Sequence, residues 1–174
     1  MVRRPGTPAA RSMLAPGPLE RRGHVRLKLV EPGLWLGYSG QHRAFQRGDG
    51  VNFAIVLRER GELCGSIGLL INARDANAAL GYWIGLPYWS RGYATEAARE
   101  VVRYGFERLG LHRIYAAHFG NNPASGRVLR KIGMAYEGTR REHHRKWGEY
   151  EDRVEYGLLV SEWQAAQRSA GSML

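Results

Sequence analysis

Alternating apolar and polar residues predict strands in the first half of the chain. A first strand is expected over His24–Val30, where valine and leucine positions alternate with arginine and lysine. Phe53–Arg58 and Glu62–Ile71 are typical of two strands joined by a hairpin turn, and Leu80–Gly85 is typical of a further strand. Residues 31–50 are glycine-rich and carry no clear period.

The pattern changes to a helical period in the second half. Small and apolar residues recur at three- and four-residue steps over residues 94–109, which predicts a helix. A strand is expected over His112–Phe119, then a second helix capped by Asn122, and closing strands over Met134–Arg141 and Arg153–Val160. This order of strands, helix, strand, helix and strands indicates an α/β domain of the mixed α+β kind.

Length and composition fit one globular domain. The chain has 174 residues and 44% hydrophobic residues, and we expect the domain to cover residues 23–165. Residues 1–22 are rich in proline, glycine and arginine, which predicts a flexible basic tail, and residues 166–174 are expected to form a second tail. No apolar run approaches the roughly 18–20 residues that cross a bilayer. We therefore expect a cytoplasmic protein with no membrane partner.

The charge and the cysteine count exclude a few types of site and leave several classes of binding partner open. The net charge is +10, and residues 1–50 contribute +6 of it, from nine basic and three acidic residues. Such an excess suits a nucleic acid, a ribosome or a polyanionic cofactor. The single cysteine, Cys64, excludes an internal disulfide framework and a multi-cysteine zinc site, so no metal is expected. We expect a buried, inert thiol there.

A candidate anion site lies between the strand at 80–85 and the helix at 94–109. A loop that joins a strand to a helix through glycine directs backbone N–H groups toward one point, and the helix dipole adds positive charge. Gly92 would let a phosphate approach the backbone closely, and Arg91 could add charge at the rim. An ordinary turn with a solvated arginine is the alternative.

Several segments in a fixed order resemble the GNAT acetyltransferases, in particular the RimJ/RimL-type ribosomal-protein N-terminal acetyltransferases. The resemblance covers about two thirds of the chain, from about Val51 to Trp163. It is carried by residues 81–85 (Gly-Tyr-Trp-Ile-Gly), 87–97, 111–116, 122–129, 131–134, 146–152 and 156–159. The resemblance implies a mostly antiparallel central sheet of about six or seven strands, with one splayed pair and flanking helices.

The resemblance also implies acetyl-CoA as cosubstrate and an amine as acceptor, either a protein N-terminus, such as that of a ribosomal protein, or a small amine. The implied cofactor-binding residues are Trp83, Ile84, Gly85, Ser90, Arg91, Gly92, Tyr93, Ala94, Thr95, Asn122 and Ser125. Trp89 departs from the family, because glutamine or arginine is usual at its position in the phosphate-binding motif. The departure is mild, since backbone amides make most of the contacts.

Two residues are candidates for catalysis. The resemblance places Ser125 near the cofactor sulfur, where its hydroxyl could protonate the departing thiolate; a local helix-start hydroxyl is the alternative. Many relatives use a tyrosine later on this helix, where Arg130 stands here. Ala79 stands where relatives often have a glutamate base, so we consider His118, since an imidazole titrates near neutrality. A structural histidine is the alternative.

The sequence is compatible with two other classes of function. Ala79 and the unusual first 50 residues are compatible with a CoA-binding protein that has little transferase activity. The basic first 50 residues are compatible with a ribosome- or RNA-associated module, although no aromatic and basic RNA-binding signature accompanies them. The sequence leaves open which amine is the acceptor. It also leaves open whether the protein forms a homodimer.

Overall fold

The central element is a seven-stranded sheet with the strand order β1-β2-β3-β4-β5-β7-β6. The computed structural model describes residues 23–29 and 50–171, so the tail expected over 1–22 and the glycine-rich segment over 31–49 lie outside the described residues. The strands are β1 (Val25–Leu29), β2 (Gly50–Leu57), β3 (Leu63–Asn72), β4 (Asn77–Ile84), β5 (Arg113–Phe119), β6 (Ala135–Lys146) and β7 (Glu149–Leu159). Each strand expected from the pattern is confirmed.

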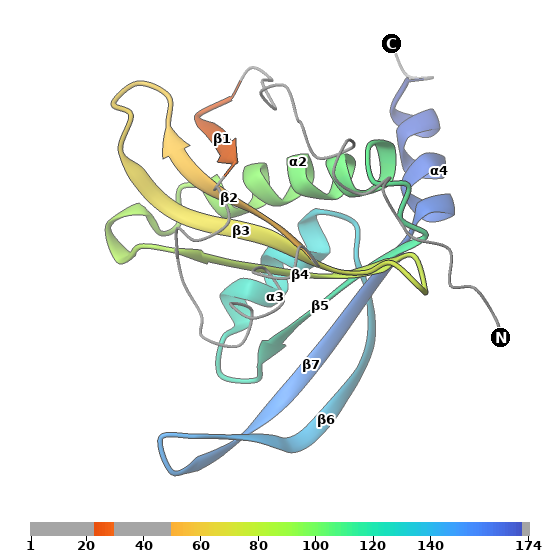
Figure 1. Cartoon of the computed structure of the whole chain (residues 1–174). Coiled ribbons are helices and arrows are strands. Elements are labelled where there is room, and N and C mark those ends of the chain that lie inside the picture. Colours follow the sequence, from red (N-terminus) through yellow and green to blue (C-terminus); the bar gives the residue numbers. More distant parts are fainter. Residues whose placement is uncertain (1–22, 30–49, 172–174) are drawn as a thin grey trace, which may run out of the picture.

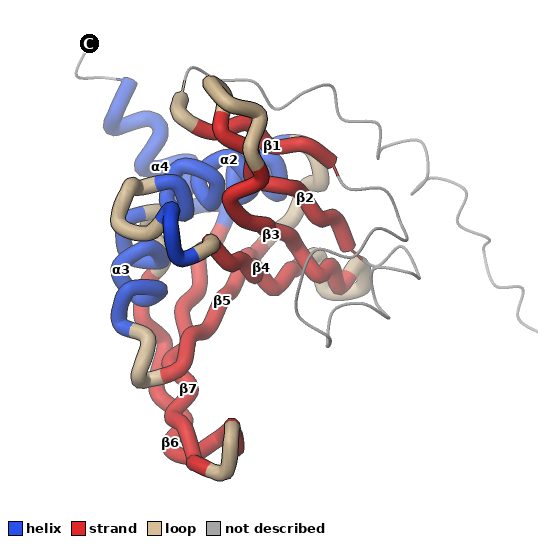
Figure 2. The backbone as a smooth tube through the Cα atoms, turned by 90° about the vertical axis from the view of Figure 1, so that its left-hand side faces the viewer, coloured by secondary structure: helices blue, strands red, loops and turns tan. Residues whose placement is uncertain are grey.

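Helices cover one face of this sheet (Figures 1 and 2). They are α2 (Tyr93–Glu107), α3 (Pro123–Lys131) and α4 (Val160–Gly171), and a short 3-10 turn, η1 (Leu86–Tyr88), leads into α2. The two helices expected from the periodicity are confirmed. Helix α4 was not expected from the sequence. It contacts α2 through Trp163, which packs on Phe106 with ring centroids 5.5 Å apart. In the described part of the chain, no helix has the length and apolar character of a membrane span.

One strand junction departs from regular pairing. All neighbouring strands pair antiparallel except β4 and β5, which run parallel. Their register covers only Asn77–Ala79 against Arg113–Tyr115. Beyond this point the two strands diverge, while β4 stays paired with β3 up to Ile84 and β5 stays paired with β7 up to Phe119. The splayed pair that the resemblance implied is therefore present.

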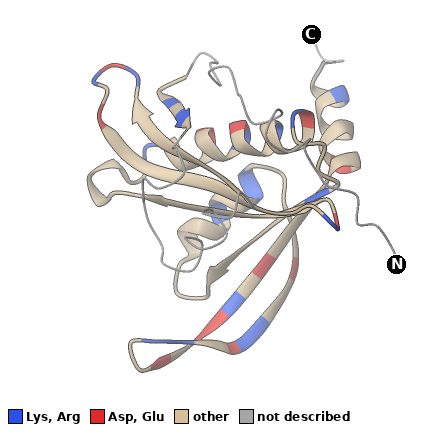
Figure 3. Ribbon diagram, in the orientation of Figure 1, with Lys and Arg blue, Asp and Glu red and all other residues tan. Residues whose placement is uncertain are grey.

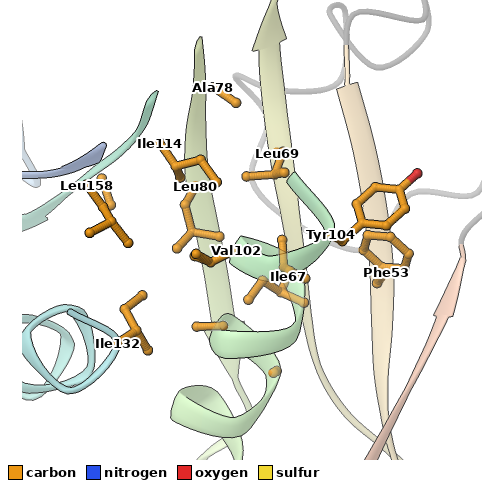
Figure 4. Packing of buried hydrophobic residues seen from close by; sticks show 14 of the residues in the cluster. Phe53, Ile67, Leu69, Ala78, Leu80, Val102, Tyr104, Ile114, Ile132 and Leu158 are labelled. Atoms are coloured by element: carbon orange, nitrogen blue, oxygen red, sulfur yellow. The ribbon is translucent and has the colours of Figure 1, made fainter. Parts of the chain in front are cut away.

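The core lies between α2 and the sheet. Ala97, Ala98, Val101 and Val102 of α2 are at most 1% exposed, and they face buried side chains of β3, β4 and β5 (Figure 4). Two alanines in succession let the helix approach the sheet closely, and burial of the valines stabilises that contact. The tight packing fixes where α2 begins, and this start carries the candidate anion site.

Strands β6 and β7 form a longer arm than the sequence predicted. The expected strands ended at Arg141 and began again at Arg153, whereas the observed hairpin runs on to Lys146 and from Glu149. Most of β6 is exposed, so its residues show no alternation of apolar and polar positions, whereas β7 is half-buried to buried beyond its first two residues. Both signs of charge follow the arm (Figure 3), and ion pairs such as Arg140 with Glu155 join its strands.

Candidate active site

The start of α2 offers backbone N–H groups without a side-chain cap. Gly92 is the N-cap, with a left-handed backbone at φ 83°, and no side chain caps the helix. Glu96 is the first residue whose N–H donates back along the helix, to the Gly92 carbonyl at 3.0 Å. The N–H groups of Tyr93, Ala94 and Thr95 therefore lack intrahelical acceptors and can bind an anion.

The conformation of Gly92 also keeps the space in front of the helix clear. Among the residues that the structure describes, a Cβ atom added at Gly92 would meet no atom within 4 Å. Ser90 adopts a positive φ of 60° in the same loop, and Arg91 is exposed beside it. An uncapped helix start, a clear approach and an exposed guanidinium together fit the pyrophosphate of CoA.

The free side of β4 lies next to this loop. Gly85 N–H donates to the Cys64 carbonyl of β3 at 2.9 Å, so the odd-numbered residues of β4 direct their backbone groups toward β3. Because these directions alternate along a strand, Tyr82 and Ile84 direct theirs toward the diverging β5. Trp89 Nε1 donates to the Ile84 carbonyl at 2.7 Å, which ties the loop to the strand end.

Helix α3 begins on the far side of the diverging strands. Its N-cap is Asn122, as the sequence predicted, and Asn122 Oδ1 accepts the Ser125 N–H at 3.2 Å. Ser125 Oγ lies 2.7 Å from the Tyr82 hydroxyl of β4, and the Tyr82 hydroxyl is also 3.2 Å from the Ser125 carbonyl oxygen. Burial raises the pKa of Tyr82, and its hydrogen bond with Ser125 opposes that shift.

His118 of β5 lies beneath the first turn of α3. Its Nδ1 is 2.7 Å from the Phe119 carbonyl, which can only accept, so Nδ1 carries a proton. A Cβ built on Gly126 would lie 2.6 Å from Nε2, so the ring packs closely on the helix. The ring also stacks on Tyr156 at a centroid distance of 5.7 Å.

The predicted site residues thus come from three segments around the diverging strands. Ser90–Thr95 form the loop and helix start, Trp83–Gly85 end β4 and enter the loop, and Asn122 and Ser125 begin α3. His118 joins them under α3. Tyr82 is not among the site residues that the sequence predicted. The alternation of β4, which places Leu80, Tyr82 and Ile84 on one face, was the signal that could have found it.

Two further predictions concern cysteine and metals. Cys64 is buried, as expected, and its Sγ donates to the Ile55 carbonyl at 3.3 Å. Burial is the main cause that raises the pKa of this thiol. Over residues 23–29 and 50–171, no group of three or more histidine, cysteine, aspartate or glutamate side chains is arranged to hold a metal ion.

Comparison with known proteins identifies the family. Residues 30–135, more than half of the chain, match the family model described as an acetyltransferase (GNAT) domain. The chain therefore belongs to the GNAT acetyltransferase family, which confirms the resemblance noted in the sequence. The seven-stranded, mostly antiparallel sheet confirms the expected fold class.

Individual relatives agree with this assignment. The chain is 36% identical over 116 residues to the uncharacterized N-acetyltransferase YoaA of Bacillus subtilis, covering 66% of each. It is 31% identical over 84 residues to the ribosomal protein uS5-alanine N-acetyltransferase of Escherichia coli, covering 48% of this chain and 43% of the relative. A GNAT-family acetyltransferase structure from Bacillus anthracis matches with a TM-score of 0.60 at 33% identity, over 63% of this chain and 66% of that one. Each match spans less than two thirds of the relative's own length.

Proposed function

We propose that this protein transfers the acetyl group of acetyl-CoA to a primary amine. The observation that carries the proposal is the uncapped start of α2, where the N–H groups of Tyr93, Ala94 and Thr95 lack intrahelical acceptors beside the free side of β4. In a GNAT-family chain this arrangement suits the pyrophosphate and the pantetheine arm of CoA. Acetyl-CoA supplies the thioester that the acceptor amine attacks.

The chain's own groups then have separate roles. The amides at the start of α2 hold the pyrophosphate, with Arg91 adding charge and Ser90 shaping the loop. The end of β4, from Trp83 to Gly85, lies along the cofactor arm. The backbone groups of Tyr82 and the N–H of Ile84 face this arm, while the Ile84 carbonyl accepts from Trp89 Nε1. N–H groups on this side also suit the oxyanion of the tetrahedral intermediate. Asn122 shapes the start of α3, and Ser125 protonates the departing thiolate.

For the acceptor we propose a protein N-terminus, in the manner of the RimJ/RimL branch. The support is the similarity to the Escherichia coli enzyme whose name specifies the alanine of ribosomal protein uS5. A ribosomal acceptor would place the protein in the cytoplasm. Because that similarity covers 48% of the chain, the proposal needs a direct test against other amines.

The test is thiol release by the full chain. Acetyl-CoA is mixed with a peptide that begins with alanine, with the same peptide blocked at its α-amine, and with spermidine. We expect CoA thiol to be released with the free peptide and not with the blocked one. Release with spermidine alone would overturn the protein acceptor. CoA binding by calorimetry with no release on any amine would instead indicate a CoA-binding protein without transferase activity.

His118 is the base that we propose for this reaction. Its Nδ1–H donates to the Phe119 carbonyl, and its Nε2, which lies against Gly126, would take the proton of the acceptor amine through water. We expect His118→Gln to lower kcat/KM by about a hundredfold or more, with unchanged affinity for CoA. If the variant melts at a lower temperature but keeps its kcat/KM, His118 serves only to pack against Gly126.

A further inference from the structure

Two hydroxyl groups meet where β4 and α3 face each other across the diverging strands. Tyr82 Oη lies 2.7 Å from Ser125 Oγ and 3.2 Å from the Ser125 carbonyl oxygen. The two residues are 43 positions apart in the chain and come from different elements. Ser125 is held from a second side as well, because its N–H donates to Asn122 Oδ1 at 3.2 Å. Both the backbone and the hydroxyl of Ser125 are therefore fixed.

The pair has two hydroxyl protons, and they can be arranged in two ways. The Ser125 carbonyl can only accept. In the first arrangement Tyr82 directs its proton to that oxygen while Ser125 donates to Tyr82 Oη. In the second arrangement Tyr82 donates to Ser125 Oγ, and the proton of Ser125 is free for another acceptor. The two acceptors of the Tyr82 proton belong to one residue, so only a small rotation of the O–H bond separates the arrangements.

Several features keep Tyr82 in its donor form. The side chain is half-buried, and desolvation raises the pKa of the phenol, an effect that the hydrogen bond with Ser125 partly offsets. The phenol therefore keeps its proton through neutral and mildly alkaline pH. Its place on β4, two residues before Ile84, puts it on the strand side that faces α3.

We propose that Tyr82 is a positioning residue that donates to Ser125 Oγ and thereby directs the Ser125 proton to the departing thiolate. The inference rests on the proposed function, since it needs Ser125 to protonate the sulfur of CoA. Tyr82 itself contacts neither sulfur nor acceptor in this scheme. It fixes the direction of the Ser125 hydroxyl and stabilises the serine oxygen while that oxygen gives up its proton.

The step balances with water as the only additional species. The amine nitrogen forms a bond to the carbonyl carbon, and the C–S bond breaks with its electron pair going to sulfur. Sulfur takes the proton of Ser125 Oγ, which gives the CoA thiol. The nitrogen loses one proton to water or to His118, and Ser125 Oγ regains one from water. Tyr82 keeps its own proton throughout. Only the oxygen that accepts its hydrogen bond changes, from the Ser125 carbonyl to Ser125 Oγ.

A double-mutant cycle tests this role. Tyr82→Phe, Ser125→Ala and the double variant are compared by kcat on the alanine peptide, by CoA affinity in calorimetry and by melting temperature. We expect Ser125→Ala to lower kcat about a hundredfold. Tyr82→Phe should lower it about tenfold, as the loss of one oriented hydrogen bond predicts, with unchanged CoA affinity. The double variant should match Ser125→Ala within about twofold, because Tyr82 acts only through Ser125.

Tyr104→Phe is the matched control. Tyr104 is also a phenol whose pKa is raised by burial, but its hydroxyl has no hydrogen-bond partner within the described residues and it lies on α2, packed on Phe53. We expect this variant to keep the kcat of the parent chain. Tyr82→Phe with unchanged kcat, or a double variant whose losses multiply, would overturn the inference. A parent chain that binds CoA but acetylates no amine would overturn the proposed function, and the role of Tyr82 with it.

Discussion

Replacing Gly92 with valine is expected to abolish CoA binding while leaving the fold intact. Gly92 has a φ of 83°, which a β-branched residue adopts only with strain of roughly 1–2 kcal/mol. The added Cβ would meet no atom of residues 23–29 and 50–171 within 4 Å. It would instead occupy the clear space at the start of α2 that we assign to the pyrophosphate. We expect the CoA dissociation constant in calorimetry to rise at least a hundredfold.

The other end of the same helix offers a matched control. Gly110 follows α2 and has a φ of 64°, and no atom of the described part of the chain lies within 4 Å of a Cβ added there. Gly110→Val should therefore impose similar strain without approaching the helix start, because the 15 residues of α2, about 22 Å of helix, lie between the two glycines. Equal loss of stability in both variants, with loss of CoA binding in Gly92→Val alone, is the expected outcome. Unchanged CoA affinity in Gly92→Val would remove the basis for the cofactor site.

Local signals in the sequence predicted the parts of the site that local interactions determine. The three- and four-residue period over 94–109 predicted α2, because its alanines and valines pack on the sheet on one side only. Asn122 followed by Pro123 predicted the start of α3, because a side-chain cap needs only its own turn. Gly92 predicted an anion site at the start of α2. In the structure Gly92 is the N-cap, and no side chain caps the helix.

Long-range features could not be predicted in this way. The contact of Tyr82 with Ser125 depends on where β4 and β5 diverge, and no local period encodes that point. Strand β6 is exposed along most of its length, so it rests on backbone pairing with β7 and shows little apolar alternation. Helix α4 is largely exposed and has few buried positions apart from the contact of Trp163 with Phe106.

Replacing Gly65 with alanine is expected to destabilise the fold strongly, because β3 and β4 approach each other closely at this residue. Gly65 pairs with Ile84, next to a bulge in the β2–β3 register after Ile55. An added Cβ would overlap the Trp83 carbonyl oxygen and lie 2.8 Å from Ile84 Cδ1 and 3.2 Å from Ile84 Cα. Backbone atoms cannot move aside without separating the strands. We expect the free energy of unfolding to fall by about 3 kcal/mol, which corresponds to a drop in melting temperature of roughly 6–12 °C.

Gly85→Ala separates this clash from a general sensitivity of the region. At Gly85 the nearest atom to an added Cβ is Tyr88 Cδ2 at 3.4 Å, an ordinary contact, and φ is −62°. We expect this variant to lose less than about 1 kcal/mol. Because Gly65 supports the end of β4, the folded fraction of Gly65→Ala should also bind CoA more weakly, since Ile84 would move relative to the start of α2. A Gly65→Ala protein with the parent melting temperature would show that β3 and β4 are not in such close contact at this point.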